Sequence, residues 1–399
     1  MNSTKRLMHT APDVRQAIAL SSRRCVDLLY WLPGSAYIRK SPFLIADLLW
    51  RHSGTIALPI HVGVTVNRPP ESFIPVSEDR LLAFSIACFE QAGLDRDHAH
   101  LISRLLVNSD LRGVRSHGTR QVNGYCSAFE DRKLNPAPAI RVIHETPTAV
   151  VVDGDGTLGY WPMVDATNKA IEKAKALGMG MGLVRNIGHY GSAGHYTRIC
   201  MEQGLVGFSV QGTRNHGNAK GAEKKPQIGY FGNPPLCFAI PAGEEPPVVL
   251  DVATRILADY QRSPEFDDLL TRIPAAFFKS IGYGAVANLL GGGLAGITTP
   301  GADESVIRWP GAPSGGMVLA IDIGSVIPQQ TFEDAVDRYV RDIRDTHDPL
   351  PGYARALLPG AIEEERFKTH RENGIRYGEM EQTAAREVSD RLGVALPWE

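Results

Sequence analysis

The sequence lacks the features that define several broad classes of protein. It contains no apolar run long enough to span a bilayer, so no transmembrane segment is expected. Its five cysteines include no Cys-x-x-Cys pair, which disfavours a disulfide framework or a zinc site and favours thiols in a reducing compartment such as the cytoplasm. A formal net charge of −2 provides no basic excess for nucleic acid or anionic membranes.

The remaining composition is that of a soluble globular protein, and 399 residues suffice for two domains. Residues 1–74 differ from the rest, because their apolar pieces follow no period and they contain no recognisable secretory signal. We expect a poorly ordered N-terminal extension there, with a targeting or docking segment as the alternative.

Regular patterns begin at Ser77, which is followed by two acids and starts a helix that ends at Gly93. A run of apolar residues at 146–153 predicts a buried strand. Further along, the segment 267–278 is read as a connection to Gly282-Tyr283-Gly284, before a glycine-rich helix at 285–297. A final helix is expected at 379–392.

The segment Asp110–Arg120 concentrates polar chemistry, with one histidine, three arginines and an aspartate in eleven residues. A neutral histidine exchanges protons near pH 7, and an arginine grips a carboxylate through two parallel hydrogen bonds. These are the tools of a site that interconverts hydroxy acids and oxo acids. The alternative is a basic loop packed on its own surface.

A Gly-x-Gly-x-x-Gly sequence at 154–159 follows the first predicted strand and precedes a helix, which is the dinucleotide-binding pattern of Rossmann folds. The next strand ends in Arg185-Asn186 instead of the expected acid, and no repeated strand–helix units follow. A glycine-rich turn is therefore the favoured reading.

Six motifs follow one another in order over about 77–397. They are Asp-x-Arg-Gly-x-x-Ser-His-Gly at 110–118, Asn-x-x-His-x-Gly-x-x-Gly-x-Tyr at 186–196, Gly-Asn-Pro at 232–234, Asp-x-Ala-Thr at 251–254, Gly-Tyr-Gly at 282–284 and Pro-Gly at 359–360. Through these motifs the chain resembles the malate/L-lactate dehydrogenase family, whose members also include ureidoglycolate, sulfolactate and diketogulonate dehydrogenases.

The resemblance implies an α/β fold of the malate/L-lactate dehydrogenase type, with a mixed, mostly antiparallel sheet domain and a helical domain, not a Rossmann fold. It implies a homodimer that transfers hydride between NAD or NADP and a small 2-hydroxy or 2-oxo carboxylic acid. The expected segments are the extension 1–74, a helical part at 75–145, a sheet-based cofactor domain at 146–325, and helices at 326–399 that return to the helical part.

The resemblance also assigns site residues. It implies proton transfer by His117, with His189 second, and no metal. The family's carboxylate-binding arginine falls at Gln121 here, so Arg120 is the candidate, with Arg115 in reserve. The cofactor contacts implied by the family segments are Thr213, Asp251, Val252, Ala253, Gly282 and Gly360.

Two departures keep other functions open. The family's lysine before Tyr-Gly is Ile281 here, and the stretch between Thr254 and Gly282 is short. A cyclic-imine or keto-sugar-acid reductase on the same scaffold is one alternative. A catalytically impaired member that acts as a binding protein is the other.

Overall fold

The computed structural model describes residues 67–214, 227–256 and 264–399, and all that follows concerns these ranges. The predicted extension lies outside the described residues up to position 66. Its last part, 67–74, is described and includes the start of strand β1 (Phe73–Val76), which pairs antiparallel with β9 (Ile375–Gly378).

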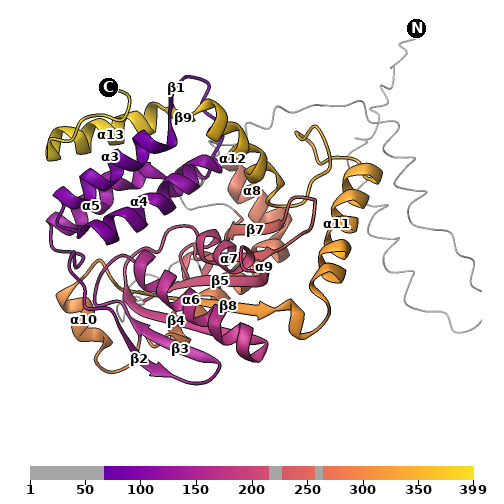
Figure 1. Ribbon diagram of the computed structural model, residues 1–399, viewed down its shortest axis with the longest axis horizontal. Coiled ribbons are helices and arrows are strands. Elements are labelled where there is room, and N and C mark those ends of the chain that lie inside the picture. Colours follow the sequence, from indigo (N-terminus) through magenta and orange to yellow (C-terminus); the bar gives the residue numbers. More distant parts are fainter. Residues whose placement is uncertain (1–66, 215–226, 257–263) are drawn as a thin grey trace, which may run out of the picture. The chain divides into compact units, whose positions relative to one another are not determined.

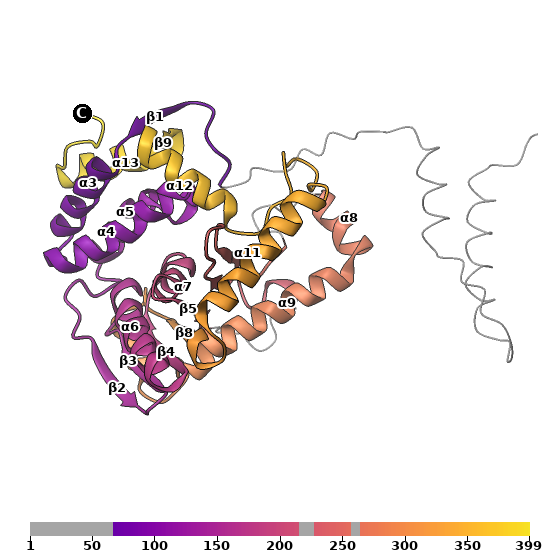
Figure 2. The same cartoon turned by 45° about the vertical axis from the view of Figure 1, so that its right-hand side comes forward.

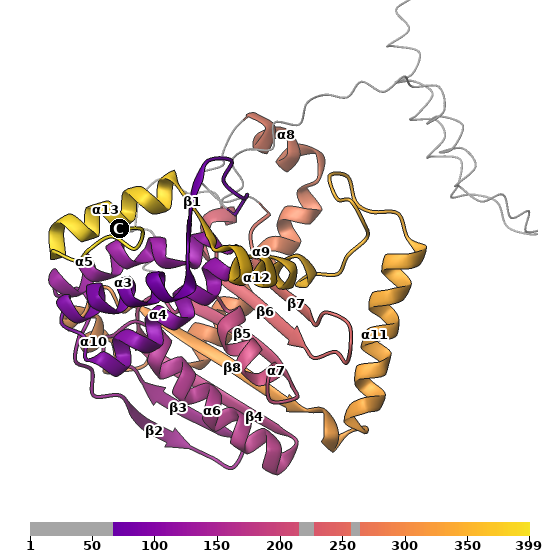
Figure 3. The same ribbon diagram turned by 45° about the horizontal axis from the view of Figure 1, so that its top comes forward.

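A seven-stranded sheet has the order β2-β3-β4-β8-β5-β6-β7, and its strands lie side by side in Figure 3. Only β3 and β4 are parallel, so the expected mixed, mostly antiparallel sheet is confirmed. The strands span Arg141–Glu145 (β2), Ala149–Asp153 (β3), Met179–Ile187 (β4), Leu205–Thr213 (β5), Pro235–Ile240 (β6), Val248–Ala253 (β7) and Ser314–Asp322 (β8).

Helices cover both faces of this sheet (Figure 2). Helices α6 (Tyr160–Leu177) and α7 (Gly194–Met201) pack on one face, where β4 has glycines. A Cβ at Gly180 would lie 2.0 Å from the Ala170 carbonyl oxygen, so glycine lets strand and helix approach. On the other face lie α9 (Pro274–Asn288) and the π-helical turn Leu289–Leu294.

The helical part packs around its own apolar core and is visible beside the sheet in Figure 1. It consists of α3 (Glu78–Gln91), α4 (Arg96–Leu111), α5 (Val122–Glu130), α12 (Ala361–Asn373) and α13 (Glu379–Leu392). Ser77 caps α3 by accepting a hydrogen bond from the Arg80 backbone N–H at 3.4 Å, which confirms the predicted helix start. The last predicted helix is confirmed as α13.

The glycines at 154–159 form a tight turn between β3 and α6, and close packing explains them. A Cβ at Gly154 would lie 2.3 Å from Ile187 Cγ2, and one at Gly156 would lie 2.1 Å from the Trp309 ring. Gly156 also has φ of +83°, a conformation that favours glycine. The turn therefore serves the junction of strand and helix, as the favoured sequence interpretation expected.

The expected connection at 267–278 is wrong, because α8 (Pro264–Arg272) and α9 occupy it. Gly282-Tyr283-Gly284 lies inside α9 instead of preceding a helix. A Cβ at Gly284 would lie 3.5 Å from Phe231 Cβ, so this helix face sits close to the chain before β6. Tertiary packing here overrides the poor helix propensity of glycine.

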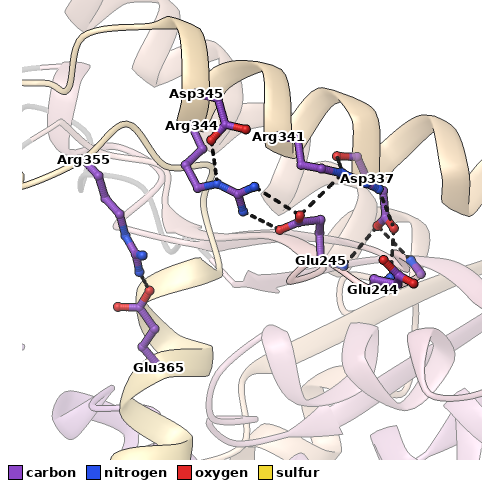
Figure 4. A network of polar contacts seen from close by, with 9 residues as sticks. Glu244, Glu245, Asp337, Arg341, Arg344, Asp345, Arg355 and Glu365 are labelled. Carbon is purple, nitrogen blue, oxygen red and sulfur yellow. Dashed lines mark hydrogen bonds and ion pairs between the residues drawn. The ribbon is translucent and has the colours of Figure 1, made fainter.

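Helix α11 (Gln329–Thr346) is attached to the turn between β6 and β7 by a polar cluster (Figure 4). The Asp337 carboxylate accepts hydrogen bonds from the backbone N–H groups of Gly243, Glu244 and Glu245 at 2.9–3.2 Å. Arg344 donates to Glu245 at 2.6 Å. These contacts fix the turn that leads into β7.

The short helix α10 (Ala302–Arg308) precedes β8.

Within the described ranges, no single helix combines the length and apolarity needed to cross a membrane. By length and composition alone, one pair of segments bent by 99° would qualify together, Phe266–Arg272 with Pro274–Leu294.

Candidate active site

The loop after α4 is shaped by the buried carboxylate of Asp110. It accepts hydrogen bonds from the Thr119 backbone N–H at 2.8 Å and from Thr119 Oγ1 at 2.6 Å. Burial raises the pKa of Asp110 to about 7, against the lowering effect of these bonds. A Cβ at Gly118 would lie 1.7 Å from Asp110 Oδ1, so only glycine fits between them. The Asp, Gly and Thr of the motif thus fold the loop that presents the histidine.

His117 ends a 3₁₀ turn, Arg115–His117, and lines a pocket between the helical part and the sheet strand β7. Ser116 Oγ lies 2.8 Å from His117 Nδ1, and the Ser116 backbone N–H donates to Asn67 Oδ1 at 3.0 Å. These contacts orient the ring, while Nε2 has no hydrogen-bond partner in the described part of the chain. Burial lowers the pKa of His117, although Asp251 opposes this effect.

His189 lies on the loop between β4 and α7, at the predicted strand-to-helix position. Its Nδ1 is 2.5 Å from Tyr125 Oη, and the Tyr125 hydroxyl lies 3.2 Å from that of Tyr160. Burial, with His117 nearby, lowers the pKa of His189 to about 3. The rings of His117 and His189 have centroids 5.4 Å apart, so the structure brings the two predicted histidines together as neutral imidazoles.

The pocket has a volume of about 1210 Å³ and extends from the histidines to the edge strand β7. Five residues from the predicted cofactor set line it: Thr213, Asp251, Val252, Ala253 and Gly360. Asp251 Oδ2 accepts hydrogen bonds from Ser192 Oγ and, at 2.9 Å, from the Gly194 backbone N–H. Ser192, three residues after His189, is therefore hydrogen-bonded to strand β7.

Gly360 places a late loop against β7. Its φ is +101°, and a Cβ there would lie 2.8 Å from the Val249 backbone nitrogen. The Val249 N–H donates to the Pro359 carbonyl at 2.9 Å. Glycine is required at this position by both the conformation and the close approach.

Other predicted site residues lie elsewhere. Arg115 is buried in the helical part, where it forms an ion pair with Glu381 and donates to the Arg68 carbonyl at 2.8 Å. Arg120 contacts Met380 Sδ at 3.5 Å and does not line the pocket. Gly282 is exposed on α9, and it too is outside the pocket lining.

The sequence did not indicate the roles of several groups in or next to the pocket. Tyr125 contacts His189, and Ser192 donates to Asp251; both residues stand within or just after motifs. Arg198 of α7 lines the pocket with 7% of its surface exposed. The sequence signal for its burial was its place in a short helix next to Thr197, Ile199 and Cys200. Among the described residues, no group of three or more His, Cys, Asp or Glu side chains is arranged to hold a metal ion.

Comparison with known proteins gives consistent results. The family model described as malate/L-lactate dehydrogenase matches residues 76–261. Malate dehydrogenase from Pyrococcus horikoshii is 27% identical over 355 residues, covering 81% of this chain and 97% of that protein. L-sulfolactate dehydrogenase from Methanocaldococcus jannaschii is 27% identical over 349 residues, with the same coverage. Ureidoglycolate dehydrogenase (NAD(+)) from Escherichia coli is 24% identical over 295 residues, covering 68% of this chain and 83% of that protein.

A solved structure shares the fold. The malate dehydrogenase structure from Pyrococcus horikoshii aligns with a TM-score of 0.69 at 24% identity, over 82% of this chain and 98% of that chain. The fold expected from the motifs is confirmed by this alignment.

Proposed function

We propose that this chain is a member of the malate/L-lactate dehydrogenase family that transfers hydride reversibly between NAD or NADP and a small 2-hydroxy or 2-oxo carboxylic acid, which the family-model match and the relatives support. It would then be a dehydrogenase acting on CH–OH donors. One observation carries the proposal: two neutral imidazoles lie 5.4 Å apart in a pocket that continues to β7. A neutral imidazole accepts the hydroxyl proton when the acid is oxidised.

His117 is the better proton acceptor of the pair. Both rings are engaged at Nδ1, His117 by Ser116 and His189 by Tyr125, and Nε2 of each has no partner in the described chain. The pKa of His189, about 3, makes its imidazole a weak base at neutral pH. Burial lowers the pKa of His117 as well, but the Asp251 carboxylate opposes this lowering, whereas His189 has no such carboxylate among the causes of its shift. We therefore assign proton transfer to His117 and its orientation within the pocket to Ser116, with His189 as a neutral neighbour.

The pocket fits a nicotinamide dinucleotide together with a small acid. Its volume exceeds the range of about 300–1,000 Å³ typical of small-molecule sites. The backbone of β7 at Asp251–Ala253 and the loop at Gly360 would hold the dinucleotide, with Thr213 at the end of β5. The chemistry that a bound nicotinamide supplies is the hydride. A substrate panel run with both nucleotides determines which acid reacts and whether NAD or NADP is used.

The first test replaces His117 by asparagine. We expect His117→Asn to bind NADH or NADPH as the wild type does and to lose about 10²- to 10⁴-fold in turnover. The matched control is His144→Asn, because His144 is exposed on β2, at the opposite sheet edge from β7. Near wild-type turnover in His117→Asn would show that the proton-transfer assignment is wrong.

The second test is a substrate panel with both nucleotides. It contains malate, sulfolactate, lactate and ureidoglycolate with their oxo counterparts, plus a cyclic-imine carboxylate and a keto-sugar acid. Nucleotide binding is followed by fluorescence titration. Turnover of any panel member identifies the substrate class, whereas a folded protein that binds neither nucleotide would be a binding protein instead of a dehydrogenase.

A further inference from the structure

We propose that Arg198 binds an anionic group of the substrate, a carboxylate or sulfonate, inside the pocket that contains His117. The inference rests on the proposed function, since it names the residue that would hold the acid. Arg198 lies in helix α7, which follows the loop that carries His189. Ser192 and Ala193, between the two residues, line the same pocket.

The Arg198 guanidinium is buried without a partner among the described residues. Only 7% of the residue is exposed, and none of the guanidinium nitrogens has a hydrogen-bond or ion-pair partner among the described residues. Nε is completely shielded from solvent. A buried charge is costly unless it is paired, so a guanidinium in this setting favours an anion that enters the pocket. Its planar nitrogens match a carboxylate through two parallel hydrogen bonds.

The other pocket arginine is different. Arg355 forms an ion pair with Glu365 at the pocket rim, and both side chains are about half exposed (Figure 4). Its charge is thus already matched and largely hydrated. Gln121, the position at which the resemblance implies an arginine, donates instead to the Ser116 carbonyl at 2.6 Å. Arg198 is therefore the buried cation of the pocket lining in the described chain.

The neighbours of Arg198 leave its charge available. Asp251 is close, because a Cβ at Gly194 would lie 2.5 Å from Arg198 Nη1 and 2.6 Å from Asp251 Oδ2. That carboxylate already accepts from Ser192 and Gly194, and it forms no ion pair with Arg198 within 4.0 Å. Arg112, whose pKa is lowered first by burial and then by Arg198, is paired with Glu364.

His195 adds no positive charge of its own. Burial lowers its pKa well below the ordinary value, and Arg198 lowers it further. An anion that enters the pocket therefore meets the Arg198 guanidinium, which has no partner in the described chain, while the nearby histidines His117, His189 and His195 carry no charge that would compete for it.

The test measures anion binding without turnover. Malonate is titrated calorimetrically into the wild type, Arg198→Met, Arg198→Lys and the control Arg355→Met. We expect Arg198→Met to weaken malonate binding about 10- to 100-fold, the loss typical of a charge-assisted hydrogen-bonded pair. Arg198→Lys should fall between, since lysine keeps the charge and loses the two-pronged geometry. Arg355→Met should bind malonate as the wild type does.

Three outcomes would overturn the proposal. One is unchanged malonate affinity in Arg198→Met, and another is absence of malonate binding by the wild type. The third is loss of NADH affinity with malonate affinity retained, which would assign the guanidinium to a cofactor phosphate. Because malonate binding needs no catalysis, a chain inactive on the whole panel can still show Arg198-dependent binding; the proposed function would then fail and the anion site would stand. If Arg198→Met unfolds, Arg198→Lys decides.

Discussion

Arg115 in the helical part and Arg198 in the pocket wall are both buried, with 8% and 7% of their surfaces exposed. Arg115 contacts the Glu381 carboxylate, itself 1% exposed, and the Arg68 carbonyl. Arg198 has no such partner in the described chain. Arg115 stands two residues before His117 in sequence and yet points into another region, because the tight 3₁₀ turn separates their side chains.

The difference separates structural charge from functional charge. A buried arginine with a matched carboxylate holds two segments together, here the motif loop and α13. A buried arginine that faces a pocket without a match is available to a ligand. Of four predictions, ordered from the largest expected effect to the smallest, the first and the last compare the two arginines, and the other two test buried groups beside the pocket.

Removing the paired arginine should have the largest effect. Arg115→Met leaves the Glu381 carboxylate buried and unpaired, and we expect a loss of about 3–5 kcal/mol in the free energy of unfolding. Urea denaturation measures it. Arg120→Met, which removes an exposed contact with Met380 and breaks no ion pair among the described residues, should change it by less than about 0.5 kcal/mol. If Arg115→Met and the wild type had equal free energies of unfolding, the Arg115–Glu381 pair would not stabilise the fold.

The hydrogen bond that supports His189 comes next. Tyr125→Phe leaves His189 Nδ1 buried without its partner, which should cost about 1–3 kcal/mol of unfolding free energy. Tyr339→Phe on α11 is the control, because that side chain is 68% exposed. Thermal unfolding of both variants makes the comparison, and a control as destabilised as Tyr125→Phe would contradict the account.

Acid should destabilise the protein through its neutral histidines. The folded-state pKa of His189 is about 3, below the ordinary 6.5, so the unfolded chain binds the proton first as pH falls. The stabilisation is complete above pH 6.5 and is lost progressively toward pH 3. From this residue we expect about 1 kcal/mol of loss between pH 6.5 and 5.5. His189→Gln should reduce that slope in denaturation series, and an unchanged slope would place the acid sensitivity elsewhere.

Removing the unpaired arginine should affect stability least. Arg198→Met deletes a buried charge that no described carboxylate matches, so its free energy of unfolding should stay within about 0.5 kcal/mol of wild type or rise. The comparison with Arg115→Met under identical urea denaturation is direct. A loss above about 2 kcal/mol would indicate that Arg198 serves the fold.

Local signals predicted much of the fold. Ser77 caps α3, as the two acids that follow it in the sequence indicate. The helix predicted at 379–392 has the same bounds as α13. The predicted connection before Gly282 is wrong, since helix α9 continues through these glycines and packs close to the chain before β6. Residues 67–74 were assigned to the extension, although Asn67 and Arg68 accept hydrogen bonds from the motif loop.

The site was predictable only where chemistry is local to a motif. His117 and His189 stand in motifs, and the structure places them side by side. The surroundings of an arginine depend on carboxylates far away in sequence, such as Glu381 for Arg115. No local sequence pattern indicates that Arg115 has a carboxylate partner and that Arg198 has none in the described chain.

Steady-state kinetics on the first acid that turns over test the central claim, that one pocket binds the anion through Arg198 and moves the proton through His117. We predict that Arg198→Met raises KM about 10- to 100-fold with kcat nearly unchanged. His117→Asn should lower kcat about 10²- to 10⁴-fold with a similar KM. An Arg198→Met enzyme with wild-type KM, or a His117→Asn enzyme with wild-type kcat, would contradict the account.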